Sequence, residues 1–445
     1  MLSVLGGALA AWLVPLEQAA VSEHLNGFPD ADARSQHLRP AVLAFICFIP
    51  ALGALYYASI RALDRYLLRQ FLSSLAVCFL ALYAIWLIID LSDNLSDFSD
   101  GNAPLSFIVR YYALQFPYAF IELIPFTLLL ALLYSLGKIS KNREIIGMIQ
   151  TGRGITRIIL PIVVIGFLLG TLCLGFNYHW APWVSGYQDA LIEQVNSGTS
   201  SKARNVLFHE RESGRLWFIG SFPHGYTRGE ALGEVEIRTF NSDHTPHWKL
   251  RAKSASWNPE TAAWHFHEAT VTHLDRRLYE GGPLLPVYEK SEKPLVFRDW
   301  KETPWQLIKP GLTADQLGIP DLISWLRENE NASWANKRPF LTQWHYRWAQ
   351  PWICLAIILL AAPLGIVFSR RGAGGGIAMA LFLAVSLMFS STVFLALGEA
   401  NYLPPALAAW GTNLLALGLA LVFLQRRLTG RPIYQTLKKL LPGGE

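Results

Sequence analysis

The chain consists of long apolar runs interrupted once by a long polar interval. Six runs are apolar over enough residues, at 1.5 Å per residue, to cross about 30 Å of hydrocarbon as helices. They are residues 71–91, 114–136, 158–176, 352–368, 377–397 and 406–424. Because the bilayer core admits only helices and closed barrels, the polar interval must lie in water. The pattern predicts three membrane spans, a soluble domain over residues 180–346, and three further spans.

Within the polar interval, the hydrophobic pattern alternates with a period of two. Residues 215–222, 233–240, 248–257 and 264–274 alternate apolar and polar side chains, and turn residues separate them about every ten positions. This spacing is typical of an antiparallel sandwich or jelly roll, to which residues 287–297 add a strand. The stretch 313–329 has apolar residues at helical spacing. It predicts a helix that leads back to the membrane.

The first 62 residues form an extension whose pattern leaves three interpretations open. Residues 41–60 are apolar enough to span, whereas residues 2–16 are apolar but short and lack the basic leader of a secretory signal. The extension could contribute one extra span with an external N-terminus, or two extra spans around residues 17–39. Alternatively, the physiological start lies near Leu63, which would require a non-Met codon.

Charge changes the picture only through its location. The net charge is +5 and only 16% of residues are charged, well below the quarter usual in soluble domains. Lys and Arg gather at the ends of the apolar runs, which sets topology and leaves no nucleic-acid footprint. The basic sites are Arg61, Arg65 and Arg69, the loop 138–157, Arg370 and Arg371, and the tail 428–445. These sites alternate with acidic loops, so they should be cytoplasmic and the β domain should be extracytoplasmic.

Several short motifs resemble the lipopolysaccharide-export permeases LptF and LptG, also called the YjgP/YjgQ family. The motifs are Leu63-Asp64-Arg65-Tyr66-Leu67-Leu68-Arg69, Pro125, Gly137-Lys138-Ile139, Arg143-Glu144-Ile145-Ile146, Thr151-Gly152, Ala362-Pro363-Leu364-Gly365, Ser369-Arg370-Arg371-Gly372, Leu403-Pro404-Pro405-Ala406 and Ala409-Trp410-Gly411-Thr412-Asn413. Their order and spacing cover residues 63–427 and leave out the extension. The resemblance implies a core of six transmembrane helices and an inserted periplasmic antiparallel β-jellyroll domain, in a multi-pass protein of the inner membrane.

The resemblance also implies partners. It predicts a second LptF/LptG-type permease, a cytoplasmic LptB-type ATPase dimer, LptC-like and LptA-like periplasmic bridge proteins, and lipopolysaccharide as cargo. The chain has no Gly-x-x-x-x-Gly-Lys-Ser/Thr motif, so ATP and Mg²⁺ should bind the partner ATPase and this chain should bind no cofactor. Two other functions stay open: transport of another amphipathic lipid or lipoprotein, and a membrane-anchored interaction protein. The sequence does not distinguish an F-type from a G-type subunit.

A coupling helix is predicted over residues 141–151 of the cytoplasmic loop. Ile145, Ile146 and Ile149 form an apolar stripe, and Gly152 provides the C-terminal stop. The resemblance implies that this helix inserts into a groove of the ATPase, with Arg143 and Glu144 as polar contacts. The alternative is a surface helix at the membrane interface whose Glu144 is merely solvated.

Lipid contacts are predicted at the first, second, fourth and fifth core spans. The candidates for a lateral gate or lipid site are Trp86, Asp90, Arg110, Glu122, Arg347 and Phe394. Glu122 lies inside an apolar run, where an ionisable group is either functional or a structural group facing water. The outer end of the first span is acidic, so cations for lipid phosphates must come from Arg110, Lys337, Arg338 or Arg347, from the partner, or through divalent ions.

In the β domain, Trp217, Phe218, Val235, Ile237 and Trp264 could line a lipid path or form a plain core. His265 and His267 share one strand face, but the spacing of the histidines does not match a metal site, so no metal is predicted. The four cysteines lie in different apolar runs, which indicates neither disulfides nor zinc. The glycines after Arg370 and Arg371 indicate a cytoplasmic turn and no nucleotide site.

Overall fold

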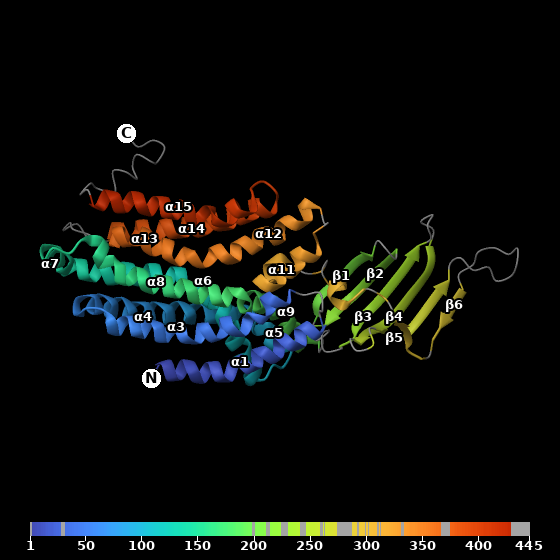
Figure 1. Ribbon diagram of the computed structural model, residues 1–445. Helices are drawn as coiled ribbons and strands as arrows, with labels where there is room; N and C mark the ends of the chain where they lie inside the picture. Colours follow the sequence, from blue (N-terminus) through green and yellow to red (C-terminus); the bar gives the residue numbers. More distant parts are fainter. Residues whose placement is uncertain are drawn as a thin grey trace.

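A computed structural model describes the chain as a long helical bundle with a β-sheet at one end (Figure 1). It describes residues 2–27, 32–197, 201–210, 214–223, 230–240, 246–258, 261, 263–273, 287–291, 293–298, 300, 302–308, 311, 313–330, 333–365 and 374–428. The cytoplasmic turn at Arg370 and Arg371 and nearly all of the tail 428–445 lie outside these residues.

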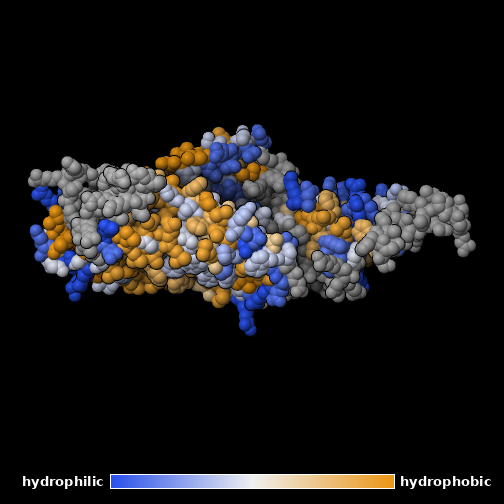
Figure 2. All heavy atoms as spheres, turned by 90° about the horizontal axis from the view of Figure 1, so that it is seen from above, coloured by the Kyte–Doolittle hydropathy of each residue, from blue (hydrophilic) through white to orange (hydrophobic). Residues whose placement is uncertain are grey.

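Eight helical segments among the described residues are long and apolar enough to cross a membrane. The long helices are α1 (Leu2–Gly27), α3 (Arg39–Ser59), α4 (Ala62–Asp93), α6 (Leu105–Lys141), α8 (Ile155–Tyr178), α12 (Trp334–Ala349), α13 (Ile353–Gly365), α14 (Gly374–Glu399) and α15 (Pro405–Leu428). Helices α12 and α13 make one segment through the short helix η4 (Gln350–Trp352). Hydrophobic surface covers much of the bundle (Figure 2), as lipid contact requires.

Six of the eight segments overlap the six predicted core spans, so the predicted helical membrane fold is confirmed; the last residues of the predicted span 352–368 lie outside the described residues. The other two, α1 and α3, fill the extension and match the interpretation with two extra spans. The run 2–16 looked short because Glu17 follows it, yet α1 continues through Pro15 and Glu17 to Gly27. Glu17 is accommodated by an ion pair with Arg39, which the local pattern does not reveal.

The β domain is one antiparallel sheet of seven strands. The strands are β1 (Ser201–Glu210), β2 (Arg215–Pro223), β3 (Leu232–Phe240), β4 (Pro246–Asn258), β5 (Ala263–His273), β6 (Val287–Lys290) and β7 (Leu295–Arg298). Strands β1 to β6 pair in chain order, and β7 pairs with the outer edge of β5 beside β6. The predicted antiparallel β domain is thus confirmed, with the described strands connected up and down where a jelly roll has Greek-key connections.

A line of irregular residues crosses the sheet from β1 to β5. Asn205, Gly220, Glu234, Lys253 and Glu268 are each passed over in the strand pairing, and Asn205, Glu234 and Glu268 have positive φ. On either side of this line the same face of the sheet stays buried. Each of the strands β1 to β5 thus has one residue outside its alternation, and because neighbouring strands have it at the same level, the register between them is unchanged across the line.

Shorter helices complete the described structure, and several helices lie where the β domain was predicted. They are α2 (Ala33–His37), α5 (Leu95–Asp100), α7 (Glu144–Gln150), α9 (Trp180–Ser197), α10 (Pro304–Ile308), η3 (Ala314–Gln316) and α11 (Ile319–Glu328). Helix α9 occupies the start of the interval 180–346, and α12 occupies its end. The predicted single strand at 287–297 is two strands, and the predicted helix at 313–329 is η3 followed by α11.

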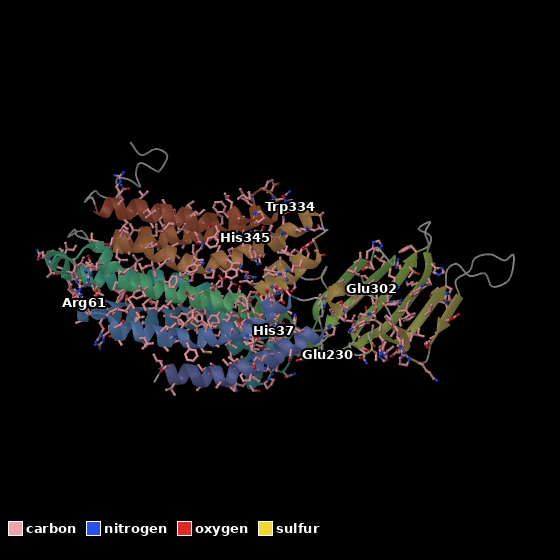
Figure 3. The ribbon with its side chains drawn as sticks, viewed as in Figure 1. His37, Arg61, Glu230, Glu302, Trp334 and His345 are labelled. Carbon is pink, nitrogen blue, oxygen red and sulfur yellow. The ribbon has the colours of Figure 1, made fainter. Side chains whose placement is uncertain are left out.

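The described residues form two large hydrophobic cores and a small third cluster at the outer end of α4 and α6. The larger core lies in the bundle among α4, α6, α8 and α13, and the second lies under the sheet. The buried face of the sheet is covered by Leu307 and Ile308 of α10 and by Leu317 and Leu322 around α11. The loop with Arg61 lies at the end of the bundle opposite to the sheet (Figure 3), which agrees with the topology predicted from charge.

Candidate functional sites

The predicted coupling helix is present as α7, but it begins three residues later than expected. Helix α6 continues to Lys141, and Arg143 then adopts a left-handed conformation with φ 61°. Helix α7 starts at Glu144 and ends before Gly152, whose φ of 81° favours glycine. Arg143 is therefore the residue that turns the chain into α7.

The predicted isoleucine stripe is divided between two faces of α7. Ile145 and Met148 are buried in the bundle core, and Ile149 packs against that core. Ile146 points away and keeps 36% of its surface exposed. The placement of Ile146 beside Ile145 on one face was wrong, because residues adjacent in a helix lie about 100° apart. The outward surface of α7 therefore combines Ile146 with Gly147 and Gln150.

Glu144 is held by hydrogen bonds to two side chains. Tyr66 Oη of α4 donates to Glu144 Oε2 at 2.9 Å, and Asn142 Nδ2 donates to Glu144 Oε1 at 3.0 Å. An ion pair of 2.5 Å between Arg153 and Asp64 makes a second connection to the start of α4. The loop that carries α7 is thus tied to α4 on both sides of the helix. In the sequence, Asp64 and Tyr66 were recognised only as part of a family motif, and these contacts were not predicted.

A cavity of about 300 Å³ lies inside the membrane part of the bundle. Glu122 of α6 lines it, together with Tyr346, Gln350 and Asn413 from the C-terminal block. Gln350 Oε1 has no hydrogen-bond partner among the described residues, whereas Asn413 Nδ2 donates to the Ala349 carbonyl at 2.7 Å. A mixed apolar and polar wall of this kind can receive an amphipathic molecule or ordered water.

On the side of α14, the cavity lies at the outer surface of the bundle. Phe389 and Val385 of α14 line the cavity, yet 71% and 51% of their surfaces are exposed. The cavity thus lies beside a lateral surface between α6 and α14. Among the described residues of the core spans, α4 and α14 also have the smallest share of buried residues. Their outward side chains, such as Leu80 and Phe382, form apolar faces suited to lipid or another membrane helix.

The six predicted gate residues do not form one site. Glu122 lines the cavity, but Trp86 packs against Tyr83 and Tyr112 in a separate cluster at the outer end of α4 and α6. Asp90 accepts a hydrogen bond from Asn94 Nδ2 at 3.2 Å, and Arg110 is exposed on α6.

The remaining two gate residues contact protein, and Arg347 is buried whereas Phe394 is half-buried. Arg347 is 8% exposed, and its guanidinium donates to Asn177 Oδ1 at 3.2 Å and to the Asp315 carbonyl. Phe394 packs where Gly411 lets α14 and α15 approach, since a Cβ at Gly411 would lie 3.3 Å from its ring. Arg347 therefore makes its contacts at the junction with the β domain. Of the two arginines Arg110 and Arg347, Arg110 is the better placed to bind a lipid phosphate.

The predicted rim cations Lys337 and Arg338 also have protein partners. Lys337 Nζ donates to the Glu330 carbonyl, and Arg338 donates to the Leu403 carbonyl at 2.7 Å while lying over the Trp334 ring. Trp334 is labelled at the start of α12 in Figure 3.

Four of the five predicted lipid-path residues of the sheet are fully buried. Trp217, Val235, Ile237 and Trp264 are each 0% exposed, whereas Phe218 lies on the opposite face and is 41% exposed. Trp264 Nε1 donates to the Glu302 carbonyl at 2.8 Å, and the Glu302 carboxylate accepts two hydrogen bonds from Arg215 at 2.6 and 3.0 Å. In this conformation these residues form a closed core, so lipid could pass along them only if the core opened.

Metal ligands are not clustered in the described part of the chain. No group of three or more His, Cys, Asp or Glu residues there is placed to hold an ion. His265 and His267 pair with Ser256 and Ser254 of β4 as part of the strand register.

Comparisons with known proteins agree with the motifs. The family described as "Lipopolysaccharide export system permease LptF/LptG" matches residues 65–426. The chain is 23% identical over 374 residues to the lipopolysaccharide export system permease protein LptF of Escherichia coli K12, covering 80% of this chain and 93% of the relative. The LptF protein of Shigella flexneri matches with the same identity and coverage. The matched region contains both blocks of core spans and the β domain.

Proposed function

Because the chain belongs to the lipopolysaccharide export permease family LptF/LptG, we propose that it is the permease subunit of an ABC transporter that extracts lipopolysaccharide from the inner membrane and passes it through its periplasmic β domain toward the outer membrane. The observation that carries the proposal is the match over residues 65–426, which takes in the core helices and the sheet together. The chain is a multi-pass membrane protein and a transport subunit.

Energy enters through a separate ATPase in this proposal. Helix α7 is the docking element for an LptB-type ATPase dimer, because its buried face fixes it to the bundle while Ile146, Gly147 and Gln150 face outward. Its tethers to Tyr66 and Asp64 would transmit a displacement of α7 directly to α4. ATP and Mg²⁺ bind the ATPase, and this chain binds no cofactor.

Lipid enters from the side in this proposal. The exposed faces of α4 and α14 meet a second LptF/LptG-type permease, and the cavity beside α14 receives part of the lipid from the space between the subunits. The β domain then continues through LptC-like and LptA-like proteins. The position of β1, β6 and β7 at the edges of the described sheet supports this last step, since an unpaired strand edge is a template for strand addition.

Affinity purification of the full chain from its native membrane tests the proposal. We expect the chain to co-purify with an ATPase, a second permease and lipopolysaccharide, which mass spectrometry of the extracted lipid would identify. A different amphipathic lipid or a lipoprotein in place of lipopolysaccharide would reassign the cargo. Recovery of envelope proteins without any ATPase would instead identify a membrane-anchored interaction protein.

A further inference from the structure

The helical hairpin formed by α1 and α3 lies outside the family-matched residues, yet it is closely fitted to the bundle. A Cβ at Gly6 would lie 2.6 Å from the Cys47 carbonyl oxygen, so α1 and α3 approach at backbone distance. A Cβ at Gly175 of α8 would lie 2.5 Å from Ile46 of α3. The hairpin therefore packs against α8, the third core span, through contacts that tolerate no added atoms.

At its outer end the hairpin is joined to the β domain by a buried polar network. Arg39 and Glu17 form an ion pair of 2.5 Å, with 7% and 11% of their side chains exposed. Arg39 also donates to Gln36 Oε1 at 3.0 Å, and Gln36 Nε2 donates to Asp321 Oδ1 at 2.9 Å. The chain of contacts runs from α1 through α3 to α11, the helix by which the polypeptide returns from the sheet to the membrane.

A second set of bonds joins α2 to α11. The Asp32 backbone N–H donates to Ser324 Oγ at 2.8 Å, and Arg327 donates to Asp32 Oδ1 at 2.6 Å. On the bundle side, Tyr178 Oη donates to the Ser35 carbonyl at 2.9 Å. His37 lies in this region, where the hairpin meets the sheet (Figure 3).

The junction is tight on the side of the core spans as well. A Cβ at Gly318, the residue before α11, would lie 2.7 Å from the Tyr178 carbonyl oxygen. His179 Nδ1 lies 3.6 Å from Asp321 Oδ2. Helix α11 is thus enclosed between the end of α8 and the hairpin, and a rotation of the β domain about this point would break contacts on both sides.

The polar character of this interface is informative. Buried ion pairs add little net stability compared with apolar packing, but removing one partner leaves an uncompensated buried charge and is strongly destabilising. A network of this kind therefore penalises every arrangement except the one in which all its members are paired. Such a penalty is expected in a contact that fixes the orientation of one part of the protein relative to another.

We propose that helices α1, α2 and α3 are a built-in brace that fixes the β domain relative to the membrane bundle, with Arg39 as its central positioning residue. The brace holds the direction in which the sheet points away from the membrane. This inference does not depend on which lipid the chain transports.

The test uses the full chain in lipid nanodiscs and two readouts. Ser35→Cys reports docking, because Ser35 is buried and an impermeant maleimide reacts only when the hairpin separates from α11. The four native cysteines lie within candidate membrane spans, away from that reagent. The second readout is the distance distribution between spin labels on non-canonical side chains at Arg251 of the sheet and Tyr402 of the bundle, both exposed.

Arg39→Met is compared with Arg34→Met, which removes an exposed arginine from neighbouring α2. We expect Arg39→Met to raise the Ser35→Cys labelling rate by about 150- to 5,000-fold, the factor that corresponds to about 3–5 kcal/mol for loss of a buried partner, and to broaden the distance distribution. Arg34→Met should change neither. Glu17→Gln, which keeps the side-chain size, provides the same comparison if Arg39→Met does not fold.

Two results would overturn the inference. Faster labelling with an unchanged distance distribution would mean that the hairpin docks on the β domain without orienting it. Unchanged labelling and an unchanged distribution in both Arg39→Met and Glu17→Gln would mean that the network does not hold the hairpin at all.

Discussion

Substituting Glu144 with alanine should weaken binding of the partner ATPase far more than it loosens the loop that carries α7. In the free chain, the carboxylate accepts hydrogen bonds from Tyr66 and Asn142. If it also pairs with a cation in the ATPase groove, its removal leaves that cation unpaired in the interface. Truncating one member of such a pair costs about 2–5 kcal/mol, or roughly 30- to 5,000-fold in affinity.

The hydrogen bond to Tyr66 supplies a matched control. Tyr66→Phe removes the donor and keeps both the ring and the Glu144 carboxylate. Because Tyr66 is 46% exposed, water replaces part of the lost bond, and the expected cost is about 0.5–1.5 kcal/mol. Tyr66→Phe should therefore weaken the ATPase complex by no more than about tenfold, even if all of this cost appears in binding. Glu144→Gln should resemble Glu144→Ala, since it keeps the shape and loses the charge.

The assay measures the affinity of the purified ATPase for the permease complex in nanodiscs, and ATP-driven lipid release from the same samples. A large loss with Glu144→Ala and a small loss with Tyr66→Phe would support direct pairing. Equal losses in the two variants would refute it, because the carboxylate would then act by holding the loop to α4. If neither variant changes affinity or release, the coupling contact lies elsewhere in residues 138–157.

Four further predictions concern other parts of the chain. A cysteine at Lys141 should be labelled only from the cytoplasmic side and one at Trp257 only from outside; the reverse pattern for Trp257 would overturn the topology. Glu302→Ala should destabilise the sheet by about 3–5 kcal/mol, because it leaves the partly buried Arg215 without its partner, and thermal unfolding should show this while ATPase binding stays unchanged. A photo-crosslinker at Ile237 should capture lipid only when ATP is supplied, whereas absent or ATP-independent capture would identify a permanent core. Burial, with help from the Arg39 charge, lowers the pKa of His179 below its ordinary 6.5, so the neutral form is favoured in the folded state. The contribution of this pKa shift to the free energy of unfolding is fully present above pH 6.5. It is lost as the pH falls through the folded-state pKa, by at most about 1.4 kcal/mol per pH unit. His179→Gln should flatten this pH dependence of stability, as measured by thermal unfolding.

The membrane helices and the long strands could be predicted from local pattern. Apolar length identifies a span without reference to the rest of the chain, and alternation identifies the strands β2 to β5 within one or two residues. Strand β1 was not predicted, because Ser201–Glu210 mixes charged and apolar residues with an extra position at Asn205 that interrupts the alternation.

Features that depend on contacts between distant residues could not be predicted. Helix α1 includes Glu17 because Arg39 lies beside it, and no local pattern indicates this partner. The role of Arg347 was misjudged for the same reason: its position at the membrane boundary suggested lipid contact, but Asn177 and the Asp315 carbonyl enclose it.

The predicted sites divide in the same way. The end of α7 before Gly152 could be predicted because a helix stop follows local residue chemistry, whereas its start at Glu144 could not, because Arg143 adopts a left-handed conformation. Tyr66 could not, because the hydrogen bond to Glu144 spans 78 positions. For Glu122, the sequence left a functional and a structural reading open. The cavity beside it is formed by residues from five separate segments of the chain, so only the folded structure places them together.

The most direct test of the central claim is lipid transfer in a reconstituted system. Proteoliposomes would contain this full chain, its partner permease and its ATPase, loaded with lipopolysaccharide, and an acceptor β-jellyroll protein would carry a photo-crosslinker. The account predicts that lipopolysaccharide reaches the acceptor when ATP is supplied, and that transfer stops with an ATPase variant that cannot hydrolyse ATP. Equal transfer with the inactive ATPase, or ATP-driven transfer of another lipid but not of lipopolysaccharide, would contradict it.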